Sequence, residues 1–203
     1  HPEFKKIISY INSLDMIPMI FTNTVTMSKE LADFLYQNNA SVMGKLDSLD
    51  PYLQDYFAGV KKAGSKIHRG LQNLIEAGFC ENKKKLRLGV SFVSCKLNLP
   101  EIEDIWHFCR KNNIFPNMEV LTPTGRAKDQ LPDAGLTSEE IKDYKLRLLD
   151  IDRKEFKYDW LPYTPLTASG CLQHFYSMYI TIKGNVRPCA PVKFDENPQF
   201  FEN

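Results

Sequence analysis

The feature that most constrains this chain is a regular alternation of strand-like and helix-like segments up to residue 122. Short apolar runs typical of strands cover residues 16–21, 41–46, 86–95 and 117–122. Apolar residues at helical spacing cover residues 2–14, 29–37, 67–77 and 100–112. Strands that alternate with helices usually pair in parallel, with the helices outside. The alternation therefore predicts an α/β fold, either an open parallel sheet or a barrel, with functional side chains at the carboxyl ends of the strands.

Some segments carry finer signals. Residues 16–21 are almost continuously apolar, which predicts a strand buried on both faces. Ser28 is expected to cap the second helix, and Gly78 to follow the end of the third. A polar loop that contains Pro51 and Gly59 is expected between the second strand and the third helix.

The pattern changes after residue 127. Thr137 and Glu140 stand three apart and predict a capping box. A charged amphipathic helix is expected to follow, up to about residue 152. We therefore expect two domains, residues 1–127 and residues 128–203, the second made of a connecting helix and a small cysteine-containing hairpin.

Composition excludes several classes of protein. The chain has 26 basic and 25 acidic residues, a formal net charge of +1, so no nucleic-acid or membrane surface is indicated. No apolar run approaches the roughly 18 residues that a membrane span needs, and no signal peptide is recognisable. Five widely spaced cysteines favour a cytoplasmic chain with reduced thiols.

Two of the cysteines flank a predicted hairpin. Cys171 precedes an alternating strand pattern, residues 183–185 form a turn, and Cys189 lies on the returning strand. A stiff hairpin would bring two thiolates together, as metal or cluster ligation requires. Spacing alone also allows two unlinked thiols, whereas a disulfide is disfavoured in a reducing compartment. The other three cysteines are interpreted as buried structural thiols: Cys80, Cys95 and Cys109.

The spacing Cys171-x12-Gly184-x4-Cys189 resembles the opening of the SPASM or twitch auxiliary-cluster module. That module follows the barrel in many radical S-adenosylmethionine (SAM) enzymes. Segments of the preceding chain are similar to that barrel, with Thr24 and Lys45 replacing the usual glycine and serine: HPEF (1–4), IFTNT (20–24), VMGKLDS (42–48), GLQNLIEAGF (70–79) and LGVSFVSCKLNLPEIEDIWHFCRKNNI (88–114).

The resemblance implies a partial (β/α)6, TIM-like barrel of parallel strands with helices outside, followed by a small β-hairpin module. It implies SAM and [4Fe–4S] clusters as cofactors. The Cys-x3-Cys-x2-Cys loop that binds the catalytic cluster in this family does not occur in the sequence, so we expect its ligands upstream of His1. The chain alone would not reduce SAM.

For the whole protein, the resemblance implies reductive cleavage of SAM to a 5′-deoxyadenosyl radical that abstracts hydrogen from a substrate. A peptide or protein maturase is the favoured interpretation, with an electron donor such as flavodoxin or ferredoxin as partner. A twitch-type small-molecule dehydrogenase is the alternative within the family. A non-catalytic α/β nucleotide-binding domain is the alternative from another class.

The resemblance also suggests cofactor contacts at the strand ends, although it assigns no catalytic side chain. Lys45 would pair with the SAM carboxylate, and Asp47 would hold Lys45 or cap the next segment. A buried Glu119 would need a partner such as Arg126 or Lys45, and both Glu119 and Arg126 are also candidates for substrate contact. Four further candidates for SAM binding have structural roles as their alternative: Thr22, Asn23, Ser91 and Asn98. Cys171 and Cys189 would bind the auxiliary cluster.

Overall fold

The computed structural model describes residues 1–82, 84–121, 126–161, 178–181 and 183–187. The chain divides into two compact units, residues 1–158 and residues 159–203, which are treated separately below.

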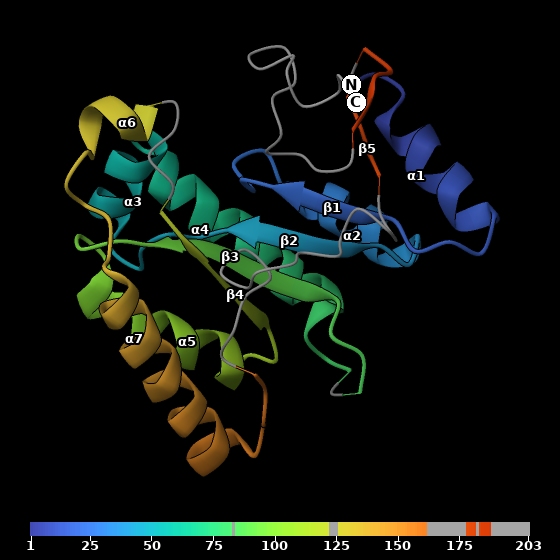
Figure 1. Cartoon of the computed structure of the whole chain (residues 1–203). Coiled ribbons are helices and arrows are strands. Elements are labelled where there is room, and N and C mark those ends of the chain that lie inside the picture. The colour runs from blue at the N-terminus through green and yellow to red at the C-terminus, as the bar shows by residue number, and fades with distance from the viewer. Residues whose placement is uncertain (83, 122–125, 162–177, 182, 188–203) are drawn as a thin grey trace, which may run out of the picture. The chain divides into compact units, whose positions relative to one another are not determined.

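A four-stranded parallel sheet forms the centre of the first unit (Figure 1). The strands follow one another in the order of the sequence: β1 (Met19–Thr22), β2 (Ser41–Lys45), β3 (Leu88–Ser94) and β4 (Phe115–Val120). All three pairings are parallel, because a helical segment returns the chain between successive strands. The predicted α/β fold with a parallel sheet is confirmed, and the six-stranded barrel remains a prediction.

One helix of this unit precedes the first strand, and the others connect the strands or follow the last one. In chain order the helices are α1 (Phe4–Ser13), α2 (Lys29–Gln37), α3 (Pro51–Ala58), α4 (Ala63–Leu74), η1 (Ile75–Phe79), η2 (Leu99–Glu101), α5 (Ile102–Lys111), α6 (Arg126–Gln130), α7 (Ser138–Ile151) and η3 (Asp152–Phe156). The predicted caps are confirmed: Ser28 accepts a hydrogen bond from the Leu31 amide, and Thr137 and Glu140 form a capping box. Gly78 adopts a left-handed conformation with φ 97°.

The two faces of the sheet differ. Leu88, Val90 and Phe92 of β3 are at most 1% exposed and lie on the face covered by helices. On this face Gly44 of β2 lies very close to α4. A Cβ atom added at position 44 would be 2.7 Å from the Leu71 side chain. Lys45 projects to the opposite face, which we call the polar face.

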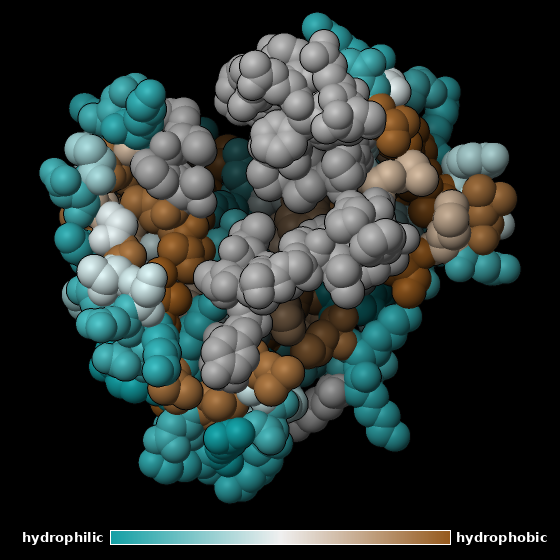
Figure 2. Space-filling view, in the orientation of Figure 1, coloured by the Kyte–Doolittle hydropathy of each residue, from teal (hydrophilic) through white to brown (hydrophobic). Residues whose placement is uncertain are grey.

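The expectation that residues 16–21 form a strand buried on both faces is wrong. Met19 is 57% exposed and Phe21 is 68% exposed, because β1 is an edge strand of the sheet and the described helices leave this face of it uncovered. Figure 2 shows apolar surface continuing over α1, where Ile7, Tyr10 and Leu14 are exposed. Here a continuous apolar run correctly predicts a strand but does not predict that both faces of the strand are buried.

The polar loop expected around Pro51 is a helix, α3. Asp50 caps it by accepting a hydrogen bond from the Tyr52 amide, Pro51 occupies its first turn, and Gly59 ends it with φ 69°. The next helix, α4, begins at Ala63 instead of residue 67. Two α-helices, α3 and α4, followed by η1, thus lie between β2 and β3. The side chain that α3 buries, Gln54, contributes to the site described below.

The first unit continues to Tyr158 and so includes α7, whereas the sequence analysis placed this helix in the second domain. Asp152, at the end of α7, is fully buried and accepts hydrogen bonds from Trp106 Nε1 and Arg110 Nε, both at 2.9 Å. These bonds attach η3 to α5. The functional assignment of residues 128–203 remains a prediction.

The predicted hairpin is present in the second unit. β5 (Tyr179–Ile180) pairs with β6 (Val186–Arg187) in antiparallel fashion. Gly184, with φ 83°, lies in the turn and donates a 2.9 Å hydrogen bond to the Thr181 carbonyl. Cys171 and Cys189 lie outside the described residues, so their roles remain predictions. None of the described helices has the length and apolarity that crossing a bilayer requires.

Candidate functional site

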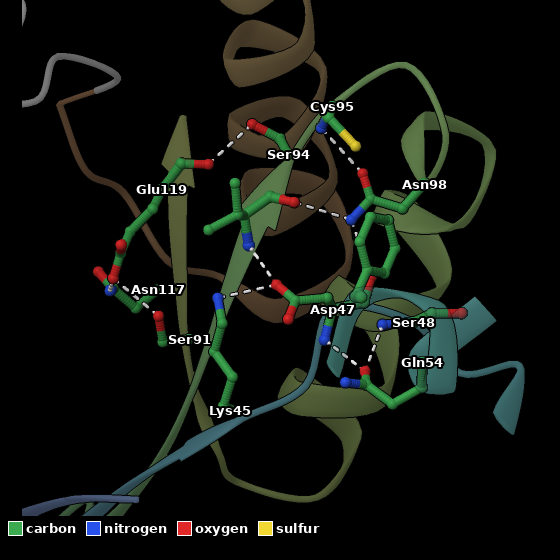
Figure 3. Close-up of polar contacts among 12 residues, drawn as sticks. Lys45, Asp47, Ser48, Gln54, Ser91, Ser94, Cys95, Asn98, Asn117 and Glu119 are labelled. Carbon is green, nitrogen blue, oxygen red and sulfur yellow. Dashed lines mark hydrogen bonds and ion pairs between the residues drawn. The ribbon is translucent and has the colours of Figure 1, made fainter. Parts of the chain in front are cut away.

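Polar side chains from three neighbouring strands gather on the polar face near the carboxyl ends (Figure 3). Lys45 of β2 is aligned with Ser91 of β3, which is aligned with Asn117 of β4. Val93 and Glu119 are aligned one pleat further along. Because aligned residues of parallel strands project to the same face, the register alone brings these side chains together.

Lys45 and Asp47 form an ion pair, with 2.8 Å between Lys45 Nζ and Asp47 Oδ1. The Asp47 side chain is 9% exposed and also accepts a 2.8 Å hydrogen bond from the Val93 amide, so two groups fix its position. The Lys45 side chain is 35% exposed. An ammonium group has three donors, so Lys45 can bind an anionic ligand while it keeps Asp47 as its partner.

Glu119 is held by neutral partners. Its Oε1 accepts hydrogen bonds from Ser91 Oγ at 2.7 Å and from Asn117 Nδ2 at 3.1 Å. The ion pair expected with Arg126 or Lys45 is not formed: Lys45 pairs with Asp47, and Arg126 donates to the Phe57 and Ala58 carbonyls. The pair was expected because Glu119 was taken as buried, whereas it is exposed and its charge remains solvated. Glu119 therefore presents a positioned carboxylate on the polar face.

The chain that follows β2 is fixed by buried amide side chains. Gln54 Oε1 accepts hydrogen bonds from the Asp47 and Ser48 amides, at 2.7 and 3.0 Å. Asn98 Nδ2 donates to the Asp47 and Val93 carbonyls, each at 2.8 Å, and Asn98 Oδ1 accepts from the Cys95 amide. Asn98 is fully buried, and both its side-chain oxygen and its side-chain nitrogen form hydrogen bonds, so it positions the carboxyl ends of β2 and β3.

Two partners in this region were not identified from the sequence. Gln54 lies on the helix that was expected to be a loop, and Glu101 Oε2 accepts hydrogen bonds from Ser48 Oγ and the Leu49 amide. The signals that would have found α3 are Asp50 before Pro51 and Gly59 at its end. No local signal indicates that Glu101, fifty-three residues after Ser48, meets this loop.

Thr22 and Asn23 form the turn that ends β1. Thr22 Oγ1 accepts from the Thr24 amide at 3.0 Å, and Asn23 Oδ1 accepts from the Val25 amide at 3.2 Å. Thr22 is aligned with Gly44, which places it on the helix-covered face. These contacts match the structural alternative for both residues, and contact with a cofactor remains a prediction.

A cavity of about 270 Å³ opens at these strand ends. Lys45, Asp47 and Arg126 provide its charged lining. Its other walls are largely apolar: Tyr56, Phe57, Val93, Cys95, Leu121, Ala127 and Leu131, with Gln130 beside them. Such a mixture of apolar walls and a few positioned polar groups is typical of small-molecule sites.

The described cysteines do not form a metal-binding site beside this cavity. Burial raises the pKa of the Cys109 thiol to about 12 and that of Cys80 to about 11, which keeps both protonated. Cys95 is buried beside the cavity. Within the ranges that the structure describes, no three side chains of metal-binding type come together.

No protein-family model matches the chain, and no curated protein matches it. Among solved structures, it is similar to native anSMEcpe with bound AdoMet and the Kp18Cys peptide, with a TM-score of 0.53 and 15% sequence identity. The same values hold for native anSMEcpe with bound AdoMet and for the form with the Cp18Cys peptide. The similarity covers 70% of this chain and 38% of the anSMEcpe chain. At this identity it shows a shared fold alone.

Proposed function

We propose that this chain is part of a radical SAM enzyme that modifies a peptide or protein. The observation that carries the proposal is the polar strand-end site, with Lys45, Asp47 and Glu119 on one face. It lies in a fold similar to that of anSMEcpe, whose structures contain AdoMet and, in two cases, a peptide. The sequence resemblance to the radical SAM barrel supports the same family independently of the structural similarity.

The residues present fit the charged and polar groups of SAM. The cofactor has a carboxylate, an ammonium group and two ribose hydroxyls. Lys45 Nζ would donate to the carboxylate, and Glu119, held by Ser91 and Asn117, would accept from the ammonium group or the ribose. Arg126, which also lines the cavity, is proposed as a substrate contact. Thr22, Asn23 and Asn98 would act by shaping the strand ends.

When bound and reduced at an iron–sulfur cluster, SAM supplies the 5′-deoxyadenosyl radical that abstracts hydrogen from the substrate. The residues of this chain would bind and orient the reactants. Asp47 fixes the direction of the Lys45 ammonium group, and the apolar cavity walls would exclude water from the reacting carbon. Cys171 and Cys189 are proposed as auxiliary-cluster ligands, and the catalytic cluster would be held by residues outside this sequence.

The first test measures SAM affinity in the full-length protein after anaerobic reconstitution with iron and sulfide. Lys45→Met should weaken SAM binding about tenfold or more, because a hydrogen bond to a charged group contributes about 1.5–3 kcal/mol. Lys142→Met, a change of an exposed lysine on α7, is the matched control and should leave the affinity unchanged. If the Lys45→Met variant bound SAM as tightly as the wild type, Lys45 would not be a SAM-binding residue.

A second test separates an enzyme from a nucleotide-binding domain. The reconstituted protein should release 5′-deoxyadenosine when SAM and dithionite are added. A Cys171→Ala/Cys189→Ala variant should contain less iron and sulfide than the wild type. Binding of SAM or a nucleotide without cleavage or cluster would favour the binding-domain alternative.

A further inference from the structure

A second cavity lies away from the strand-end site and carries a concentration of positive charge. It is a groove of about 690 Å³ between α4 and the loop that leads from β1 into α2. In the described part of the chain, the groove and the strand-end cavity have no lining residue in common. Four cations line it: Lys29, Lys62, Lys66 and Arg69.

The positive charge of the groove is poorly compensated. Among the described residues, no acidic side chain forms an ion pair with Lys62, Lys66 or Arg69, whereas Lys29 Nζ lies 3.6 Å from Glu76 Oε2. The nearby carboxylate of Asp55 accepts hydrogen bonds from backbone amides, among them that of Lys62 at 2.6 Å. The groove is therefore electropositive although the chain as a whole has a net charge of +1.

The groove is preformed by contacts between its two walls. Asn73 Nδ2 donates a 2.8 Å hydrogen bond to the Met27 carbonyl, and Thr24 Oγ1 donates to the Ile67 carbonyl at 3.0 Å. Gly70 allows the loop to approach α4, because a Cβ atom there would overlap the Thr24 carbonyl. A ligand would enter this groove without first ordering the loop, which lowers the entropic cost of binding.

We infer that this groove binds an extended acidic peptide segment. Its wall on α4 runs from Lys62 to Asn73, which at about 1.5 Å per residue is about 16 Å. An extended peptide at about 3.3 Å per residue would place about five residues along this length. Lys62 at the N-cap, and Lys66 and Arg69 within α4, follow one another at about one turn, or about 4.5–6 Å along the axis. Long, flexible side chains at this spacing can reach carboxylates on alternate residues of such a peptide, about 6.6 Å apart.

The lining favours a peptide over a nucleic acid. Single-stranded nucleic acids are bound by aromatic side chains that stack on the bases, and none of the described residues that line this groove is aromatic. Val25, Met27 and Gly70 provide an apolar part of the lining, and Ser65 and Asn73 provide polar groups. This combination suits side chains and backbone amides as well as carboxylates. The inference does not depend on the SAM chemistry proposed above.

Fluorescence anisotropy of a labelled oligo-glutamate peptide tests the inference on the full-length protein at low ionic strength. The wild type should bind the peptide, and Lys66→Glu/Arg69→Glu should weaken binding at least about fivefold. Lys84→Glu/Lys142→Glu, which changes the same number of exposed lysine or arginine charges elsewhere, is the matched control and should bind within twofold of the wild type. The neutralising variant Lys62→Gln/Lys66→Gln should show a smaller loss, and melting curves should confirm that every variant is folded.

Three results would overturn the inference. The first is equal binding by the groove variant and the matched control, because the interaction would then follow net charge alone. The second is complete competition by inorganic phosphate at the peptide's own concentration, which would indicate a simple anion site. The third is tighter binding of a single-stranded oligonucleotide than of the peptide.

Discussion

Replacing Gln54 with methionine tests how the strand-end site is held in place. Gln54 is 1% exposed, and its Oε1 accepts from the Asp47 amide at 2.7 Å and from the Ser48 amide at 3.0 Å (Figure 3). Methionine has a similar length and a similar preference for helices. The change therefore removes the shared acceptor with little change in volume or helix stability.

The expected cost follows from the two amides that lose their partner. Ser48 is fully buried and Asp47 is 7% exposed, so water cannot easily replace Gln54 at either amide. A buried group left without its hydrogen bond costs about 1–3 kcal/mol, which gives about 2–6 kcal/mol for the pair. The same change would loosen the chain that carries Asp47, and with it the partner of Lys45.

Urea denaturation followed by circular dichroism measures the free energy of unfolding. Gln72→Met is the matched control, because Gln72 is exposed on α4 and, among the described residues, its side chain bonds only to Glu76. It should change stability by less than about 0.5 kcal/mol. A loss below about 1 kcal/mol for Gln54→Met would show that Gln54 does not hold this loop as described.

Three further changes test other contacts. Asp152→Asn should destabilise the fold by about 3–5 kcal/mol, because it breaks a buried ion pair, whereas Asp150→Asn, which changes an exposed pair, should have little effect in thermal melts. Gly70→Ala should lower stability by about 1–3 kcal/mol despite the better helix propensity of alanine, whereas Gly135→Ala, with nothing within 4 Å of its Cβ, should not. The Cys109 pKa rises from about 9 to about 12 on folding, so its contribution to stability is complete below pH 9 and is lost as the pH rises towards 12, because the unfolded state loses its proton first. Cys109→Ala should flatten this decline in pH-dependent urea titrations, and an unchanged slope would contradict the assignment.

The sheet was predictable because its strands carry dense apolar runs and helical periodicity separates them. The register of β2, β3 and β4 then follows from burying one face against helices, and this register aligns Lys45 with Ser91 and Asn117. The pairing of Lys45 with Asp47 was one of two roles expected for Asp47, beside capping the next segment, and it joins residues two apart at a strand end. Local sequence patterns were therefore sufficient to predict contacts between residues that are close in the sequence.

The partner of Glu119 could not be obtained in this way. A charge pair was expected from the cost of burying an isolated carboxylate, but Glu119 is exposed and is satisfied by a hydroxyl and an amide. The exposure of a strand residue depends on what covers its face, which an amphipathic pattern does not specify. The same reason accounts for Met19 and Phe21, which are apolar yet exposed.

The basic groove is a feature that overall composition does not predict. Nearly equal numbers of basic and acidic residues indicated no nucleic-acid or membrane surface, but net charge does not specify how the charges are distributed. Lys66 and Arg69 lie on α4 and Lys62 is its N-cap residue, because that helix begins at Ala63, four residues earlier than the periodicity indicated. The carboxylates nearest in sequence have other described partners: Asp55 accepts from the Lys62 and Gly64 backbone amides, and Glu76 pairs with Lys29. The helix boundary thus brings basic side chains together in a chain of balanced composition, and the peptide-binding experiment tests whether they attract an acidic ligand.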